Sequence, residues 1–278
     1  MRMLRHAPGA RYELILLSDH GQTPGYPFHD RFGATLGDAV SAFLKENQQA
    51  AVSAGGLGLA RAQFCYLEQE LDAHARGWRH RLYRGAKKAL QRRIRELVPE
   101  TLKVDPEGGV VITYSSSLAH LYITGEPRRL DWREVEQAQP LLLQFLSRHK
   151  GIGFVMARGE GDEVCLFHRG GKLCLGGSTA PGPEELAFLR PYGEAAELLP
   201  ALRRFAENEA AGDLILFGAY NGERIACFDD QVGGHGSVGG EQMRPFLILP
   251  AGHPLLEREK LAGHEFLDHE VFLPLRGE

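Results

Sequence analysis

Cysteine is scarce in this chain, and the few that occur are far apart. The 278 residues include four cysteines, none in a CxxC pair: Cys65, Cys165, Cys174 and Cys227. This spacing excludes a zinc knuckle and a dense disulfide framework. We therefore interpret all four as buried thiols of a protein in a reducing compartment.

Long apolar runs are also missing. No run reaches the ~18 residues that a membrane-spanning helix needs. Residues 1–13 lack the apolar core of a signal peptide. The chain as written is therefore expected to be cytoplasmic.

An excess of one charge is absent too. The formal net charge is −4, with 43% hydrophobic and 24% charged residues, which is an ordinary globular balance. Nothing here requires nucleic acid as a partner. No internal repeat or low-complexity linker divides the chain, so we expect one domain over residues 1–278. No GxSxG motif surrounds the serines Ser115–Ser117, so they are not expected to be nucleophiles. They either bind phosphate or line a pocket, or simply form a turn, which is the more common case.

The most informative stretch that is present reads ELILLSDHGQT. Glu13 to Leu17 is mostly apolar and predicts a buried strand. Asp19, His20 and Gly21 follow where this strand ends, which is where open α/β sheets bind ligands. An adjacent carboxylate and imidazole either hold a metal ion or simply share a hydrogen bond in a turn.

A second turn of similar character lies far along the chain. Arg224 to Phe228 predicts a strand, which leads into a glycine-rich loop that contains His235. Another strand-like run, Phe246 to Leu249, follows this loop. Two strand ends that each carry a histidine suit a metal site assembled across a sheet.

Together the two turns resemble the alkaline phosphatase superfamily, in particular its type I phosphodiesterase/nucleotide pyrophosphatase branch. The matching motifs are Asp19-His20-Gly21 and the turn Gly234-His235-Gly236. The resemblance implies an α/β fold: a three-layer sandwich around a mostly parallel sheet, with a helical insertion and without its N-terminal part.

The same resemblance implies a two-metal site. Asp19 and His20 would hold one divalent ion and His235 the other. The expected ions are zinc, with manganese or magnesium as alternatives; imidazole ligands favour a transition metal over magnesium. Three nearby polar residues are candidates for supporting the ligands: Asp229, Asp230 and Gln242.

The implied activity is hydrolysis of phosphoric esters. In the family a Thr or Ser nucleophile and further metal ligands precede the Asp-His-Gly turn, and residues 1–12 have no room for them. The chain therefore resembles the C-terminal part of a longer bacterial enzyme, and we expect an N-terminal half or complementary chain as partner. We expect weak metal binding and little turnover from the isolated chain. The alternative is a non-catalytic relic or partner subunit that uses the same fold for binding.

Residues 48–105 are predicted to be a helical, basic insertion. Within it, Leu59 to Val98 has a helical pattern with many arginines and lysines in its second half. It is either a solvated helix packed through its apolar face, which we favour, or a contact with anionic lipid or nucleic acid. The lipid alternative would make the parent protein membrane-associated.

The remaining pattern predicts alternating strands and helices. Further strands are expected at Val110–Tyr114, Ala119–Thr124, Gly151–Arg158, Val164–His168, Lys172–Leu175 and Asp213–Gly218. Helices are expected at Leu36–Asn47, Trp132–His149, Glu184–Leu189 and Glu194–Glu207. Pro24 to Phe32 is rich in proline, glycine and aromatics and predicts a loop, with His29 and Asp30 interpreted as surface residues. His120 is interpreted as either a core or pocket-wall residue or a catalytic one.

Overall fold

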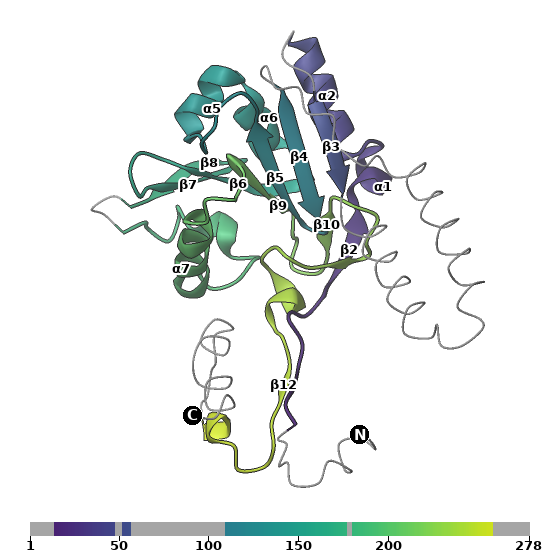
Figure 1. Cartoon of the computed structure of the whole chain (residues 1–278), viewed down its shortest axis with the longest axis vertical. Coiled ribbons are helices and arrows are strands. Elements are labelled where there is room, and N and C mark those ends of the chain that lie inside the picture. The colour runs from purple at the N-terminus through teal and green to yellow at the C-terminus, as the bar shows by residue number, and fades with distance from the viewer. Residues whose placement is uncertain (1–13, 48–51, 57–108, 177–179, 258–278) are drawn as a thin grey trace, which may run out of the picture. The chain divides into compact units, whose positions relative to one another are not determined.

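The computed structural model describes residues 14–47, 52–56, 109–176 and 180–257 (Figure 1). Its contacts divide the chain into two compact units. One unit comprises residues 20–244 and is called the sheet unit below. The other comprises residues 1–19 and 245–278, and its described part is called the ribbon unit. The single domain expected over residues 1–278 stays a prediction.

The sheet unit is organised around a seven-stranded sheet with the order β3-β4-β5-β9-β6-β7-β8. Its strands are β3 (Val52–Gly56), β4 (Val110–Ser115), β5 (Leu118–Ile123), β6 (Ile152–Arg158), β7 (Val164–His168), β8 (Gly171–Leu175) and β9 (Leu214–Gly218). Six of these elements were predicted from apolar runs and glycine turns. The exception is β3, which lies in a stretch that was predicted to be part of the helical insertion.

The prediction of a mostly parallel sheet is wrong for the described residues. Only β3 and β4 pair in parallel, and every other pair in this sheet is antiparallel. For the hairpin of β4 and β5 the reason is the length of the connection. Ser116 and Ser117 alone join β4 to β5, and two residues can close only an antiparallel hairpin, since a parallel crossover needs about a dozen or more.

Helices cover both faces of this sheet, so the α/β class is confirmed. The first face packs against α1 (Phe28–Phe32), α2 (Leu36–Glu46), α5 (Trp132–Ala138) and α6 (Leu142–Arg148). The second packs against α7 (Ala195–Ala206) and the 3₁₀ turn η2 (Ala187–Leu189). Strand β9 shows the alternation: Leu214 and Leu216 enter the first core, and Ile215 and Phe217 enter the second.

Local capping explains where two helices begin. The Thr35 side chain accepts a hydrogen bond from the Asp38 backbone N–H, and the Asp38 carboxylate accepts one from the Thr35 N–H. Asp131 and Glu134 form the same reciprocal arrangement at the start of α5. Each capping box satisfies backbone N–H groups that the first helical turn leaves unpaired.

The single helix predicted over Trp132–His149 is in fact two helices. The break falls at Pro140, whose ring cannot continue a helix and whose nitrogen has no proton to donate. Leu141, the next residue, takes the left-handed conformation with φ 65° and is the N-cap of α6. Likewise, only η2 forms within the helix predicted at Glu184–Leu189.

A small second sheet replaces the loop predicted at Pro24–Phe32. Strand β2 (Thr23–Pro27) lies between β10 (Ile225–Cys227), to which it is parallel, and β11 (Gly233–Gly234), to which it is antiparallel. The prolines misled the sequence argument, because proline is rare in central strands. Gly25 permits the close pairing: a Cβ there would lie 2.6 Å from the Cys227 sulfur.

The prediction that every cysteine is a free thiol is wrong for one pair. Cys165 and Cys174 face each other across β7 and β8 and form a disulfide. Cys227 is free and buried, as predicted. Burial raises the pKa of the Cys227 thiol to about 11, so it stays protonated at neutral pH.

The described part of the ribbon unit is a short antiparallel ribbon. Strand β1 (Leu16–Leu17) pairs with β12 (Leu247–Ile248), and η4 (Pro254–Glu257) follows. Ser18 and Phe246 extend the pairing: the Ser18 N–H donates to the Phe246 carbonyl, and the Phe246 N–H donates to the Ser18 hydroxyl. A strand therefore forms within the predicted range Glu13–Leu17, but the prediction that it is buried is wrong, since Leu16 and Leu17 are exposed.

Two predictions fall largely outside the described residues. The basic helix at Leu59–Val98 lies wholly outside them, and with it both its favoured interpretation as a solvated helix and the alternative of a contact with anionic lipid or nucleic acid. Within the described residues, no helix is both long enough and apolar enough to cross a bilayer.

Candidate metal-binding site

The two predicted histidines of the sheet unit lie against each other. The rings of His20 and His235 stack with their centroids 4.5 Å apart and their planes 10° from parallel. The two side chains come from opposite ends of the unit's sequence, so the fold itself brings them together. Sequence reasoning expected this meeting from the two glycine-flanked turns.

One hydrogen bond defines how His20 presents its ring. Its Nδ1 lies 2.7 Å from the Gly21 carbonyl oxygen. A carbonyl only accepts, so Nδ1 carries the proton and the lone pair of the neutral ring is on Nε2. Metal-binding histidines commonly use one ring nitrogen in this way and coordinate through the other.

Gly21 is required by a close approach of the backbone. Its N–H donates to the Gln242 carbonyl at 3.2 Å, within the 3₁₀ turn η3 (Gly240–Met243). A Cβ on Gly21 would lie only 1.9 Å from the Glu241 carbonyl oxygen. Glycine therefore allows the His20 turn to rest directly on η3.

The His235 backbone is held by the tight turn between β4 and β5. The His235 N–H donates to the Ser116 hydroxyl at 3.0 Å, and the Ser117 hydroxyl donates to the His235 carbonyl at 2.9 Å. Both serines are fully buried. The turn predicted at these serines is confirmed, whereas its role in anchoring the histidine loop was not predicted.

Asp229 supports the same turn, whereas Asp230 does not. The Asp229 carboxylate accepts a hydrogen bond from the Ser116 N–H at 2.8 Å, so it acts on His235 through Ser116. Asp230 pairs instead with His29, whose Nδ1 lies 3.3 Å from its carboxylate. His29 and Asp30 are exposed, in agreement with their interpretation as surface residues.

Gln242 is the buried anchor of the glycine-rich loop. Its amide nitrogen donates to the Gly239 carbonyl at 2.8 Å, and its amide oxygen accepts from the Ser117 hydroxyl at 3.3 Å. Its backbone N–H donates to the Thr23 hydroxyl, which in turn donates to the Gly239 carbonyl. Gln242 therefore connects η3, β2 and the turn that holds His235. Thr23, a second member of this network, was not singled out from the sequence.

The third predicted ligand, Asp19, is exposed and is the last residue of the ribbon unit before the sheet unit begins. The stacked imidazoles are thus the part of the expected site that the sheet unit contains. Two neutral imidazoles suit zinc or another transition metal better than magnesium. Among the described residues, no third ligand of the sheet unit converges on this histidine pair.

The contacts of His120 indicate a structural role. Its Nδ1 accepts a hydrogen bond from the Gly212 N–H at 3.0 Å, and its ring packs edge-on against Phe205. Burial, with a smaller effect from Arg129, lowers its pKa. These contacts favour the core or pocket-wall interpretation of His120.

Comparisons with known proteins add no evidence about this site. No protein-family model, no curated protein and no solved structure matches the chain.

Proposed function

We propose that this chain supplies metal ligands for the hydrolysis of phosphoric esters, in the manner of the type I phosphodiesterases/nucleotide pyrophosphatases that its turns resemble. The observation that supports this is the stacking of His20 on His235 at 4.5 Å. That separation is close to the ~4 Å gap between the ions of two-metal hydrolases, which supports the proposal that each ring serves one of two neighbouring ions.

In this proposal His20 and the adjacent Asp19 hold one ion, and His235 holds the other. Divalent ions bound there would neutralise the charge that develops on the phosphoryl oxygens. The chain's own residues orient the imidazoles: the Gly21 carbonyl fixes the ring proton of His20, and Ser116 and Ser117 hold the His235 backbone.

The ligand number limits what the isolated chain can do. A catalytic zinc ion normally has three protein ligands, and this set offers three for two ions. We therefore expect weak metal binding and little turnover from the chain alone.

Metal titration of purified variants tests this proposal. Zinc affinity is measured against a chromophoric chelator for the wild type, His20→Ala, His235→Ala and the matched control His29→Ala. We expect each variant of the pair to lose at least about tenfold in affinity and the control to stay within about twofold. Equal affinity of all four proteins would contradict the proposal.

A turnover assay examines the second half of the proposal. Hydrolysis of bis-p-nitrophenyl phosphate is expected to be very slow for the chain alone. Two equivalents of tightly bound zinc together with efficient turnover would show that the chain needs no complementary polypeptide.

The exposed ribbon favours a second candidate, a non-catalytic partner subunit. Leu16, Leu17, Phe246 and Ile248 expose much of their apolar surface, although two-stranded ribbons are marginally stable alone. A chain used only for association would keep its partner binding after His235→Ala, and its zinc affinity would not depend on that residue.

A further inference from the structure

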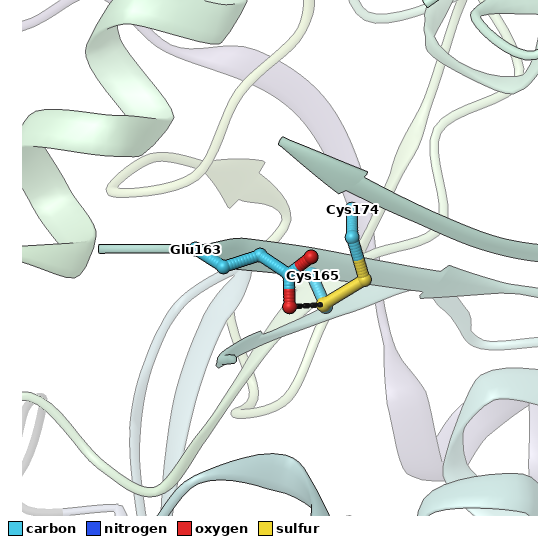
Figure 2. A group of neighbouring side chains, drawn as sticks. All are labelled: Glu163, Cys165 and Cys174. Carbon is cyan, nitrogen blue, oxygen red and sulfur yellow. Dashed lines mark hydrogen bonds between the residues drawn. A yellow bond between two sulfur atoms is a disulfide. The ribbon is translucent and has the colours of Figure 1, made fainter. Parts of the chain in front are cut away.

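A second group of metal-ligating atoms lies at the opposite end of the large sheet. Figure 2 shows Glu163, Cys165 and Cys174 on the hairpin of β7 and β8. Cys165 pairs with Ala157 of β6, near Leu214 at the start of β9, whereas the serine turn that holds His235 contacts Gly218 at the end of β9. The group is therefore separate from the histidine pair.

The strand register brings these three residues together. Cys165 and Cys174 are direct cross-strand partners, so their side chains share one face of the sheet. Glu163 precedes Cys165 by two positions, and side chains two apart in extended chain also share a face. All three ligand atoms lie within 4.8 Å of one another.

In the disulfide form, the Glu163 carboxylate lies next to the Cys165 sulfur. Glu163 Oε2 lies 3.5 Å from the Cys165 sulfur. A disulfide sulfur has no proton to donate, so this contact offers the carboxylate no hydrogen bond. After reduction the Cys165 thiol gains a proton that it can donate to Glu163.

The same three atoms suit a zinc ion once the disulfide is open. Zinc binds thiolate at about 2.3 Å and carboxylate at about 2.0–2.2 Å, usually in tetrahedral geometry. Neighbouring ligands of such an ion are roughly 3.3–3.8 Å apart, which small rotations of these side chains provide. A water molecule completes the four positions.

Access is available from the edge of the sheet. Strand β8 is the last strand, and Cys174 is only partly buried, so a thiolate reductant can reach its sulfur. Glu163 lines a surface cavity of about 510 Å³ together with Arg203 and Glu207. The buried thiol of Cys227 lies on β10, in the other sheet, so it does not compete for the ion.

We propose that Cys165 and Cys174 form a reversible disulfide whose reduced form, together with Glu163, binds one zinc ion. A dithiol reductant supplies two electrons and two protons: it attacks the Cys174 sulfur, passes through a mixed disulfide, and leaves as its own cyclic disulfide. Zinc then displaces the two thiol protons and binds both sulfurs. The hairpin is thereby cross-linked in both states, by a covalent bond or by the metal.

Cobalt(II) distinguishes this site from the histidine pair. Sulfur ligands give cobalt(II) an intense near-ultraviolet charge-transfer band, which imidazole ligands do not give. The full chain is reduced, freed of reductant under nitrogen and titrated with cobalt(II). We expect the band to saturate at one equivalent, to be lost on adding zinc, and to be absent from the air-oxidised protein.

Variants assign the band to these residues. Cys174→Ser should abolish it, and Glu163→Gln should weaken cobalt binding by at least about tenfold. The matched controls, Cys65→Ser for a thiol and Glu207→Gln for a carboxylate of the same cavity, should leave it unchanged. His235→Ala should also leave the charge-transfer band unchanged. The experiment can therefore contradict the proposed function without contradicting this site, or contradict this site without contradicting the proposed function.

Thiol counting tests the redox half. Denatured air-oxidised protein should show two reactive thiols, rising to four after reduction. Four thiols before reduction, no thiolate band in the reduced protein, or a band of equal strength in Cys174→Ser would each overturn the proposal. Should Cys174→Ser fail to fold, Glu163→Gln, which keeps both sulfurs, gives the deciding affinity.

Discussion

Two strands of this protein have almost the same sequence and opposite environments. Leu14-Ile15-Leu16-Leu17 enters β1 of the ribbon unit, and Leu214-Ile215-Leu216-Phe217 forms most of β9 in the sheet unit. Leu216 is 0% exposed, whereas Leu16 is 47% exposed. The difference lies in the neighbours: β9 has a strand on each side and helices on both faces, whereas β1 pairs only with β12.

This comparison shows what an apolar run does and does not specify. Four consecutive apolar residues predict a strand that is buried on both faces, which is correct for β9. In β1 the same pattern is exposed: Leu16 is 47% and Leu17 is 41% exposed. An apolar run therefore predicts a strand but does not by itself predict how far that strand is buried.

The largest expected difference comes from truncating the equivalent leucine in each strand. Leu216→Ala removes a fully buried side chain of the first core and should lower the free energy of unfolding by about 2–5 kcal/mol. Leu16→Ala removes a half-exposed side chain and should change it by no more than about 0.5 kcal/mol. Urea unfolding followed by circular dichroism measures both, and similar losses would show that β1 is covered in solution.

Gly21 offers the next largest effect, just after the ribbon unit ends. Gly21→Ala places a Cβ 1.9 Å from the Glu241 carbonyl oxygen, so either the His20 turn or η3 must move. We expect a loss of about 1–3 kcal/mol in unfolding free energy, together with weaker zinc binding. Gly182→Ala is the control, because its new Cβ would meet only the Glu185 carboxylate at 3.6 Å. An unchanged zinc affinity in Gly21→Ala would mean that the turn does not position His20.

Most strands of the sheet unit were predictable because their signals are local. Alternating apolar residues and the Gly170-Gly171 turn define β7 and β8, and the capping residues Thr35 and Asp131 mark helix starts. Strand direction was not predictable in the same way. It follows from which segments pair, and the superfamily resemblance suggested a parallel arrangement that the two-residue turn at Ser116 and Ser117 excludes.

The meeting of His20 and His235 was predictable from the sequence, whereas the residues that hold them were not. Two histidines flanked by glycine carry a visible motif, and His20 and His235 do meet. Ser116, Ser117 and Thr23 act through long-range hydrogen bonds, which leave no pattern in the neighbouring sequence. The disulfide was missed for a similar reason, because only the register of β7 and β8 makes Cys165 and Cys174 opposite.

A smaller effect is expected from placing charge on the ribbon. The double variant Leu16→Lys with Ile248→Glu keeps an opposite-charge pair, since these two residues are cross-strand partners. The double variant should reduce self-association of the chain and its binding of hydrophobic dyes, because charged residues protect open sheet edges. Sedimentation velocity measures this, with Val232→Lys, an exposed apolar position of the sheet unit, as control. Equal effects of the double variant and of Val232→Lys would show that the ribbon promotes self-association no more than another exposed apolar position does.

The smallest expected effect is a pH dependence that belongs to the sheet unit. Burial lowers the pKa of His120, His149 and His168, all in that unit. The unfolded chain therefore binds protons first as pH falls below about 6.5, the ordinary histidine value. Stability is fully present above that pH and is lost as pH falls toward the lower pKa values of the folded state.

Thermal unfolding between neutral and mildly acidic pH measures this slope, and His120→Gln isolates one contribution to it. The amide oxygen of glutamine can still accept the Gly212 N–H but cannot take a proton, so the variant should lose less stability on acidification. Asp213 acts in the opposite direction, because burial raises its pKa and its contribution weakens as pH rises from 3.8. A slope that is unchanged in His120→Gln would mean that the ring is solvated in the folded state, which the edge-on contact with Phe205 and the bond to Gly212 argue against.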